Sequence, residues 1–158
     1  MNDFFLARAL HVLGVVIWIG GVAMVTTVLL PAVREMKTPA ERIAFFERVE
    51  ARFARQARWV TLVTGLSGLY MVYKLDAWSR FLDASYWWMH AMVAVWAIFT
   101  VMLFVLEPFW LHERLRERAA RDPEGTFRLV LGMHRVLLAV SLATVAGAAA
   151  GSHGWLAG

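Results

Sequence analysis

Three stretches of this chain run for more than twenty residues without an aspartate, glutamate, lysine or arginine: residues 9–33, 84–106 and 136–158. An α-helix needs about 20 apolar residues to cross roughly 30 Å of hydrocarbon. Because 60% of the 158 residues are hydrophobic and only 18% are charged, most of the surface must face something other than water. The sequence therefore predicts an all-α integral membrane protein with a single membrane domain over residues 1–158.

A shorter apolar run, residues 59–73, is closed by Arg58 and Lys74. These long side chains can reach the two interfaces while their aliphatic stems stay in lipid. The run is therefore interpreted as another span. We expect a four-helix up-down bundle with helices near residues 5–31, 57–75, 85–109 and 127–153.

Basic residues are distributed unevenly between the predicted loops. Seven lie in residues 34–58 and six in residues 107–135, against Arg8, Lys74 and Arg80 elsewhere. Cytoplasmic loops carry the excess of lysine and arginine. The sequence thus predicts both termini outside (N-out/C-out), in a bacterial-type inner (plasma) membrane. It also predicts that the basic residues interact with the lipid bilayer and not with nucleic acid.

The first basic segment begins with Thr38-Pro39-Ala40-Glu41, which has the form of a capping box with proline at the first helical position. Apolar residues then recur at helical spacing among arginines. We expect a cytoplasmic amphipathic helix over residues 39–56. It either lies on the interface or leads into the second span, and a solvated connector docked on the bundle is an equal alternative.

Histidines are the polar groups that matter most within the apolar runs. At about 1.5 Å per residue, His11, His90 and His153 fall at one depth near the outer face, and His134 falls at the cytoplasmic edge. Imidazole suits iron, copper and zinc. The chain has no cysteine, which excludes disulfides, iron–sulfur clusters and covalently attached haem.

The first predicted helix carries His11, Gly14, Trp18 and Gly21 on one face. Glycine removes side-chain bulk, so a flat macrocycle could lie there, although small residues in membrane helices also mediate helix packing. We expect a b-type haem with His11 and His90 as axial ligands.

Other residues have supporting parts in this prediction. Arg8 and Lys74 lie near the outer level, where they could pair with the haem propionates. His153 and His134 are weaker ligand candidates.

Copper is the alternative metal. Met71, Met89 and Met92 lie near the same outer level as His90, and thioethers with imidazole select Cu(I). Methionines at helical spacing also fill gaps in apolar cores. A structural subunit without a cofactor is a third interpretation.

The segment from His11 to Trp18-Ile-Gly-Gly21, together with Trp88-Met-His90, resembles the CopD/HemJ-like family of small membrane proteins. Resemblance to HemJ implies haem b on His11 and His90 and an oxidoreductase acting on a porphyrinogen. Resemblance to CopD implies copper binding or transport at the outer face. Met92 stands where HemJ proteins have a lysine. The predicted role is electron transfer or oxidoreduction through the haem, with quinone or a porphyrinogen as partner and a homo-oligomer as a possible assembly.

Overall fold

The computed structural model describes residues 2–35 and 38–153, and the long segments within them are helical. The chain is all-α, as predicted, with no strand among these residues. The first apolar run forms α1 (Asn2–Met24), the π-helical segment η1 (Val25–Leu29) and α2 (Leu30–Arg34). The remaining elements are α3 (Pro39–Lys74), the short 3₁₀ helices η2 (Ala77–Leu82) and η3 (Ala84–Tyr86), α4 (Trp87–Val101), the π-helical segment η4 (Met102–Leu111), α5 (His112–Arg121) and α6 (Pro123–Ser152).

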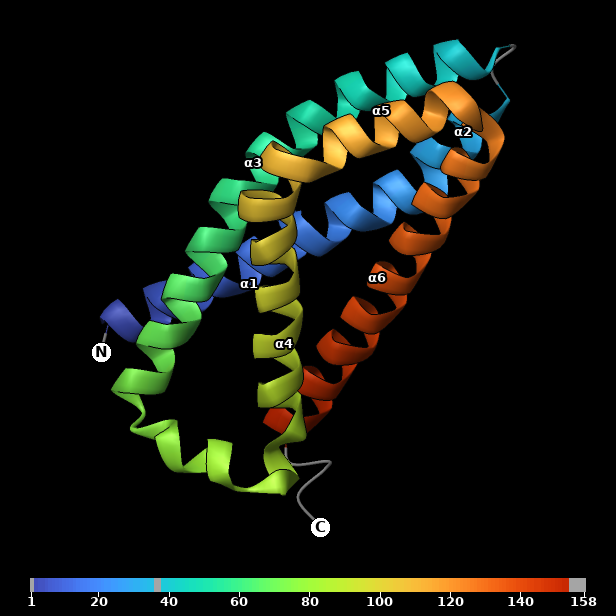
Figure 1. The fold of residues 1–158 in the computed structure, drawn as a ribbon. Coiled ribbons are helices and arrows are strands. Elements are labelled where there is room, and N and C mark those ends of the chain that lie inside the picture. The colour runs from blue at the N-terminus through green and yellow to red at the C-terminus, as the bar shows by residue number, and fades with distance from the viewer. Residues whose placement is uncertain (1, 36–37, 154–158) are drawn as a thin grey trace.

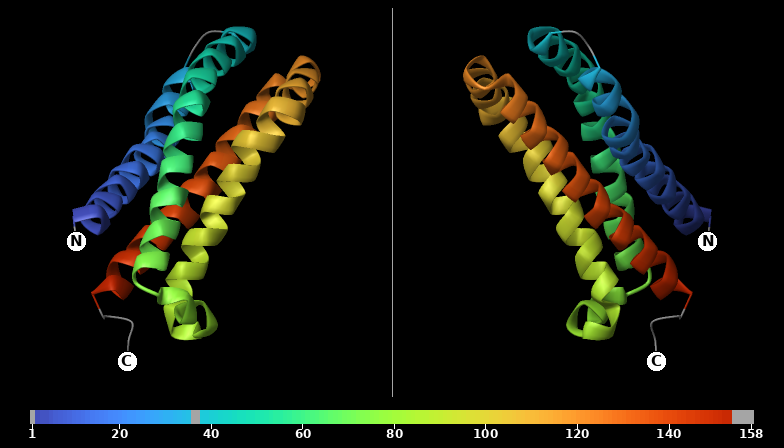
Figure 2. Two further views of the ribbon diagram at one scale, coloured as in Figure 1. Left: turned by 90° about the vertical axis from the view of Figure 1, so that its left-hand side faces the viewer. Right: turned by 90° about the vertical axis from the view of Figure 1, so that its right-hand side faces the viewer.

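The long helices run side by side in alternating directions (Figures 1 and 2). α3 returns along α1, and α6 returns along α4, and these are the two most extensive helix contacts. α2, the start of α3 and α5 lie at one end of the molecule, here called the basic end because its exposed residues include many arginines. The start of α1 and the end of α6 lie at the opposite end (Figure 2).

Three helical segments among the described residues are long and apolar enough to cross a membrane: Asp3–Arg34, Ala84–Glu107 and Pro123–Ser152. They correspond to the first, third and fourth predicted spans. The second predicted span, near residues 57–75, is less apolar than these three segments, because hydroxyl and basic side chains lower its mean hydropathy. The structure thus supports a membrane protein with several apolar helices, and the fourth crossing stays a prediction.

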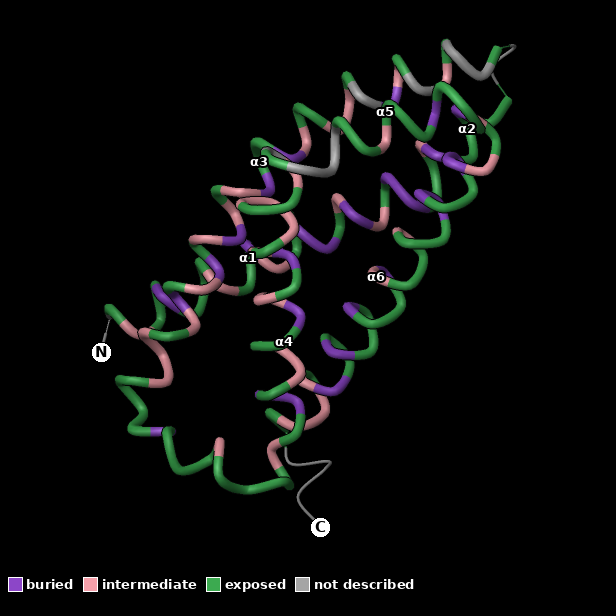
Figure 3. Tube along the Cα trace, viewed as in Figure 1, coloured by how far each residue is buried: buried purple, intermediate pink, exposed green. Residues whose placement is uncertain are grey.

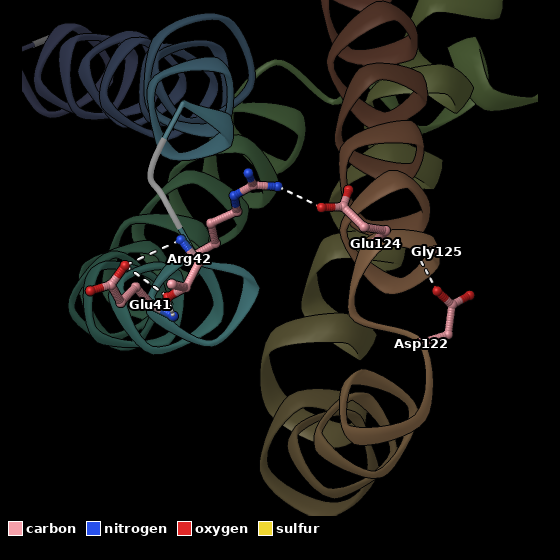
Figure 4. Close-up of polar contacts among 6 residues, drawn as sticks. Glu41, Arg42, Asp122, Glu124 and Gly125 are labelled. Carbon is pink, nitrogen blue, oxygen red and sulfur yellow. Dashed lines mark hydrogen bonds and ion pairs between the residues drawn. The ribbon is translucent and has the colours of Figure 1, made fainter.

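Helix α3 begins at the predicted capping box. The Thr38 hydroxyl accepts a hydrogen bond from the Glu41 backbone N–H at 3.3 Å, and the Thr38 N–H donates to the Glu41 carboxylate at 3.2 Å (Figure 4). From Pro39 the helix continues for 36 residues without a break. The segment therefore continues directly into the second apolar run, and its Phe46 also packs against α6.

An ion pair between distant helices joins parts of the basic end. Arg42 on α3 donates to Glu124 at the start of α6 at 2.7 Å (Figure 4). Beside it, the Asp122 carboxylate accepts from the Gly125 N–H at 2.8 Å and caps α6. The ion pair thus joins α3 to α6, and the Asp122 carboxylate satisfies a backbone N–H in the first turn of α6.

Buried side chains form two apolar clusters between the helices, while many apolar side chains face outward, as a lipid-exposed surface requires (Figure 3). The central cluster comprises Trp18, Ile19, Val22, Val95, Phe99 and Leu138. The second cluster lies toward the basic end and comprises Val25, Leu30, Val33, Phe46, Phe127, Val130 and Leu131.

Glycine 65 lets α4 approach α3 closely. A Cβ atom at Gly65 would lie 2.5–2.7 Å from three atoms of the Trp96 indole, whose N–H donates to the Thr61 carbonyl at 2.9 Å. Real Cβ atoms do not approach other atoms so closely. The rigid indole must therefore move if a side chain is added there.

We predict that Gly65→Ala lowers the free energy of unfolding by about 1–3 kcal/mol, the usual cost of overpacking. Gly20→Ala is the control, because nothing lies within 4 Å of a Cβ at that position. It should be neutral or stabilising, since alanine favours helix. Unfolding of both variants in mixed detergent, followed by circular dichroism, measures the difference, and equal stabilities would contradict the packing described here.

Candidate functional site

His11 lies on α1 and faces α3. Its Nδ1 atom is 2.9 Å from the Thr64 carbonyl oxygen and 3.5 Å from the Ser67 hydroxyl, and its ring fits against Gly68. Because a carbonyl only accepts, Nδ1 carries the hydrogen and Nε2 keeps its lone pair. His11 is half-buried in the seam between these two helices.

His90 contacts a different element. Its Nε2 atom donates to the Phe81 carbonyl of η2 at 3.0 Å, and its ring meets the Phe81 ring edge-on at 5.5 Å. The neighbouring Asp83 carboxylate accepts from the Ser85 hydroxyl and N–H, and these hydrogen bonds hold the pKa of Asp83 below its usual value. The two rings predicted to share an iron therefore each have their own partners, His11 on α3 and His90 on η2.

The face of α1 predicted to hold a macrocycle is filled by protein. A Cβ at Gly14 would collide with the Thr64 side chain, and one at Gly21 would collide with the Phe53 ring. Trp18, between them, packs edge-on against Phe99 with 4.9 Å between ring centroids. These contacts support the helix-packing interpretation of the glycines.

The remaining residues of the predicted site lie apart from one another. Arg8 is exposed, and the Lys74 ammonium lies 2.9 Å from the Asp3 carboxylate and over the Tyr70 ring. His153 is exposed and bonds the Ala149 carbonyl of its own helix at 2.8 Å. The structure does not bring these side chains together around one point.

Another group of polar residues surrounds a cavity of about 80 Å³ between α1, α3, η4 and α6. Its polar walls are Glu50, Glu107 and His134, and two thioethers, Met102 and Met133, also line it. The other lining residues are apolar: Trp18, Val22, Val25, Leu29, Phe46, Phe53, Ala54, Ala57, Phe99, Leu103, Leu115, Val130 and Leu137. The cavity is thus an apolar pocket that contains a few polar and soft donor groups.

His134 of α6 lines this cavity. Its Nδ1–H donates to the Val130 carbonyl one turn earlier at 2.9 Å, and its ring meets Phe46 edge-on at 6.0 Å. The hydrogen bond fixes the tautomer and leaves the Nε2 lone pair free, the usual arrangement of a metal-binding histidine. We predicted His134 as a weaker candidate, and the structure gives it more suitable surroundings than His90.

Glu107 was not among the residues predicted for a site, although pairing of the loop carboxylates with arginines was expected. It lies in the π-helical segment η4, lines the cavity and forms an ion pair with Arg58 of α3. The Arg58 Nε–H also donates to the Leu103 carbonyl at 2.9 Å. The signal available in the sequence was that both charges end predicted spans at the same membrane level.

Comparison with known proteins identifies the family of this chain. A family model described as copper resistance protein D matches residues 47–148, which is more than half of the chain. The chain belongs to the CopD family. No curated protein and no solved structure matches it.

The CopD match covers residues of both candidate sites. It covers most of α3, all of α4, η4 and α5, and most of α6. The five polar and thioether residues of the cavity lie within it, whereas His11 lies before it. His90 lies within the matched range too, and the cavity wall also includes residues that precede it: Trp18, Val22, Val25, Leu29 and Phe46.

We predict that Glu107→Gln lowers the free energy of unfolding by about 1–3 kcal/mol, because it leaves the Arg58 guanidinium without its charged partner. The control is Glu124→Gln, which breaks the pair with Arg42 at the basic end, where the Glu124 side chain is 57% exposed. That change should cost less than about 1 kcal/mol. Thermal unfolding in detergent compares them, and a larger loss for Glu124→Gln would contradict this ranking.

Proposed function

We propose that this protein is a copper-binding and copper-transporting membrane protein, and that Cu(I) binds in the cavity. The observation that carries the proposal is that the CopD-matched region places the His134 imidazole and the Met102 and Met133 thioethers on the walls of one cavity. His134 would bind through Nε2, whose lone pair the hydrogen bond to Val130 leaves available.

The donor set favours Cu(I) over harder metals. Soft thioethers together with imidazole select Cu(I), whereas manganese and magnesium prefer carboxylate, carbonyl and water oxygens. Among the described residues, no three histidine, aspartate or glutamate side chains are grouped so that they could hold a metal ion. A metal site in this region would therefore depend on methionine.

The carboxylates Glu50 and Glu107 support a cation in the same cavity. In surroundings of low dielectric constant, negative groups attract a positive ion more strongly than they do in water. Arg58 pairs with Glu107 from the side of α3, so it offsets part of this negative charge. The cavity thus combines binding groups for a soft ion with an electrostatic preference for a positive one.

Orientation and location follow from the basic residues. We propose that the basic end faces the cytoplasm of a bacterial-type inner membrane, with both chain termini outside. The cavity would then lie in the cytoplasmic half of the bundle, nearer to the start of α3 than to its end. A haem between His11 and His90 has no comparable support, because Thr64 and Phe53 fill the face of α1 that it would need.

We predict that His134→Ala weakens Cu(I) binding by about tenfold or more, since even the loss of an indirect metal partner has that effect. Met102→Leu with Met133→Leu should also weaken it while preserving side-chain volume. The measurement is anaerobic competition between the purified protein and a chromogenic Cu(I) chelator.

The matched control is His153→Ala, whose imidazole is exposed and bonds only its own helix in the contacts described. Its Cu(I) affinity should equal that of the wild type. If His11→Ala or His90→Ala abolishes binding while His134→Ala does not, copper binds at the opposite end and the cavity proposal is wrong.

A further inference from the structure

The first half of α3 carries a row of arginines on the side that faces away from the bundle. Arg48, Arg52 and Arg55 are all exposed and follow one another at intervals of four and three residues. With about 3.6 residues per turn, this spacing places the three side chains within about 60° of one another around the helix axis. They therefore form one basic strip, here called the arginine strip, which is about 10 Å long.

The arginine strip lies on the side of α3 opposite the cavity. Ala54 and Ala57 are buried and line the cavity. They lie two and five residues beyond Arg52, which places them about 140–160° from it around the axis. The strip therefore takes no part in packing the bundle, and it faces whatever surrounds the protein.

The three guanidinium groups have no carboxylate partner among the described residues. None of the ion pairs of these residues includes Arg48, Arg52 or Arg55. The Arg48 Nε–H donates to the Ala44 carbonyl one turn earlier at 3.2 Å, and this carbonyl is a neutral group of the same helix. The strip is thus available to a negatively charged partner.

The same face of α3 continues beyond the strip as an apolar surface. Trp59 lies four residues after Arg55 and is 71% exposed, and Val63 and Leu66 follow on the same side at 39% and 66%. Exposed tryptophans gather at the boundary between hydrocarbon and headgroups. The face therefore changes from basic to aromatic to aliphatic, which is the order that the headgroups, boundary and hydrocarbon of one leaflet require.

Distances along α3 place two of the arginines near the headgroups. With Trp59 at the boundary, Arg55 lies about 6 Å and Arg52 about 10 Å further toward the basic end. The headgroup layer of each leaflet is about 5–8 Å thick. Arg55 therefore lies within this layer and Arg52 at its outer edge. Arg48, about 6 Å beyond Arg52, is still within the Debye length of roughly 8–10 Å.

Helix α5 is also rich in arginine but has a different surface. Arg118 and Arg121 are exposed, yet Glu113 and Glu117 share the exposed surface of this ten-residue helix. Its leucine, Leu115, packs against the second apolar cluster and not toward lipid. α5 thus lacks the exposed apolar continuation that the arginine strip has.

We propose that the arginine strip and Trp59 bind an anionic phospholipid, with Arg52 and Arg55 on its phosphate oxygens. Guanidinium groups match phosphate through paired N–H donors. Clusters of basic residues beside a membrane span are typical of sites for acidic lipids. The acyl chains lie along Trp59, Val63 and Leu66. Because the strip and the cavity are on opposite sides of α3, this lipid binding is independent of the copper proposal.

The test measures the binding of single lipids by native mass spectrometry. The purified full chain, in a non-ionic detergent, is titrated with phosphatidylglycerol or with phosphatidylcholine that has the same acyl chains. Both lipids contain a phosphate, but only phosphatidylglycerol is anionic. Each arginine near an anionic surface strengthens binding by about fivefold, so the wild type should prefer phosphatidylglycerol by about tenfold or more.

Arg52→Gln with Arg55→Gln should weaken phosphatidylglycerol binding by about 25-fold and leave phosphatidylcholine binding nearly unchanged. The matched control is Arg118→Gln with Arg121→Gln on α5, which removes the same charge from the same end of the molecule. Its phosphatidylglycerol affinity should stay within about twofold of the wild type, because charges further away than a Debye length are screened. All four arginines are exposed, so both variants should fold, and circular dichroism checks this.

Three results would overturn the proposal. The wild type could bind both lipids equally, the α3 variant could bind phosphatidylglycerol as tightly as the wild type, or both variants could lose affinity equally, which would indicate net charge alone. A mass of two chains that disappears only in the α3 variant, without a lipid preference, would show that the strip contacts a second copy instead.

Cu(I) affinity measured on the α3 variant separates this inference from the proposed function. The variant should bind Cu(I) as tightly as the wild type, since neither arginine lines the cavity. If the lipid preference behaves as expected and the wild type binds no copper, only the copper proposal is wrong. If copper binds and the lipid preference is absent, only the lipid site is wrong.

Discussion

The close contact between α1 and α3 is the interaction on which the rest of the structure depends. Gly14 and Gly21 of α1 admit side chains of α3, and Gly68 of α3 admits the His11 ring. In a membrane, where lipid is as apolar as the side chains, helices associate through such packing and through hydrogen bonds between helices. This contact places Trp18 of α1 on the same cavity wall as Phe53, Ala54 and Ala57 of α3.

Three spans and the start of α3 could be predicted because they depend on local sequence. Uninterrupted apolar runs of membrane length mark three helices, and Thr38 with Glu41 marks the start of α3. The second predicted span, near residues 57–75, is less apolar than the other three for a physical reason. The hydroxyl and glycine residues of this segment lower its mean hydropathy. They face other helices, so the segment is well packed although it is less apolar.

The grouping of functional side chains could not be predicted in the same way. Depth along a helix follows from counting residues, but rotation about the axis is undetermined when a helix is apolar on every side. His11 and His90 were expected to meet, yet α1 presents His11 to α3 while His90 bonds η2. Glu107 lies in the π-helical segment η4 and lines the cavity. No local sequence pattern predicts a π-helix, so this position could not be inferred from the sequence.

The unbroken length of α3 has a mechanical consequence. Its 36 residues span about 54 Å, well beyond the roughly 30 Å of a hydrocarbon core. The half that carries Arg42 and the half that carries Thr61 are therefore one stiff rod, without a proline or turn to act as a joint. A tilt of one end of α3 therefore also tilts its other end. The pair between Arg42 and Glu124 is in this way mechanically linked to the buried hydroxyls several turns away.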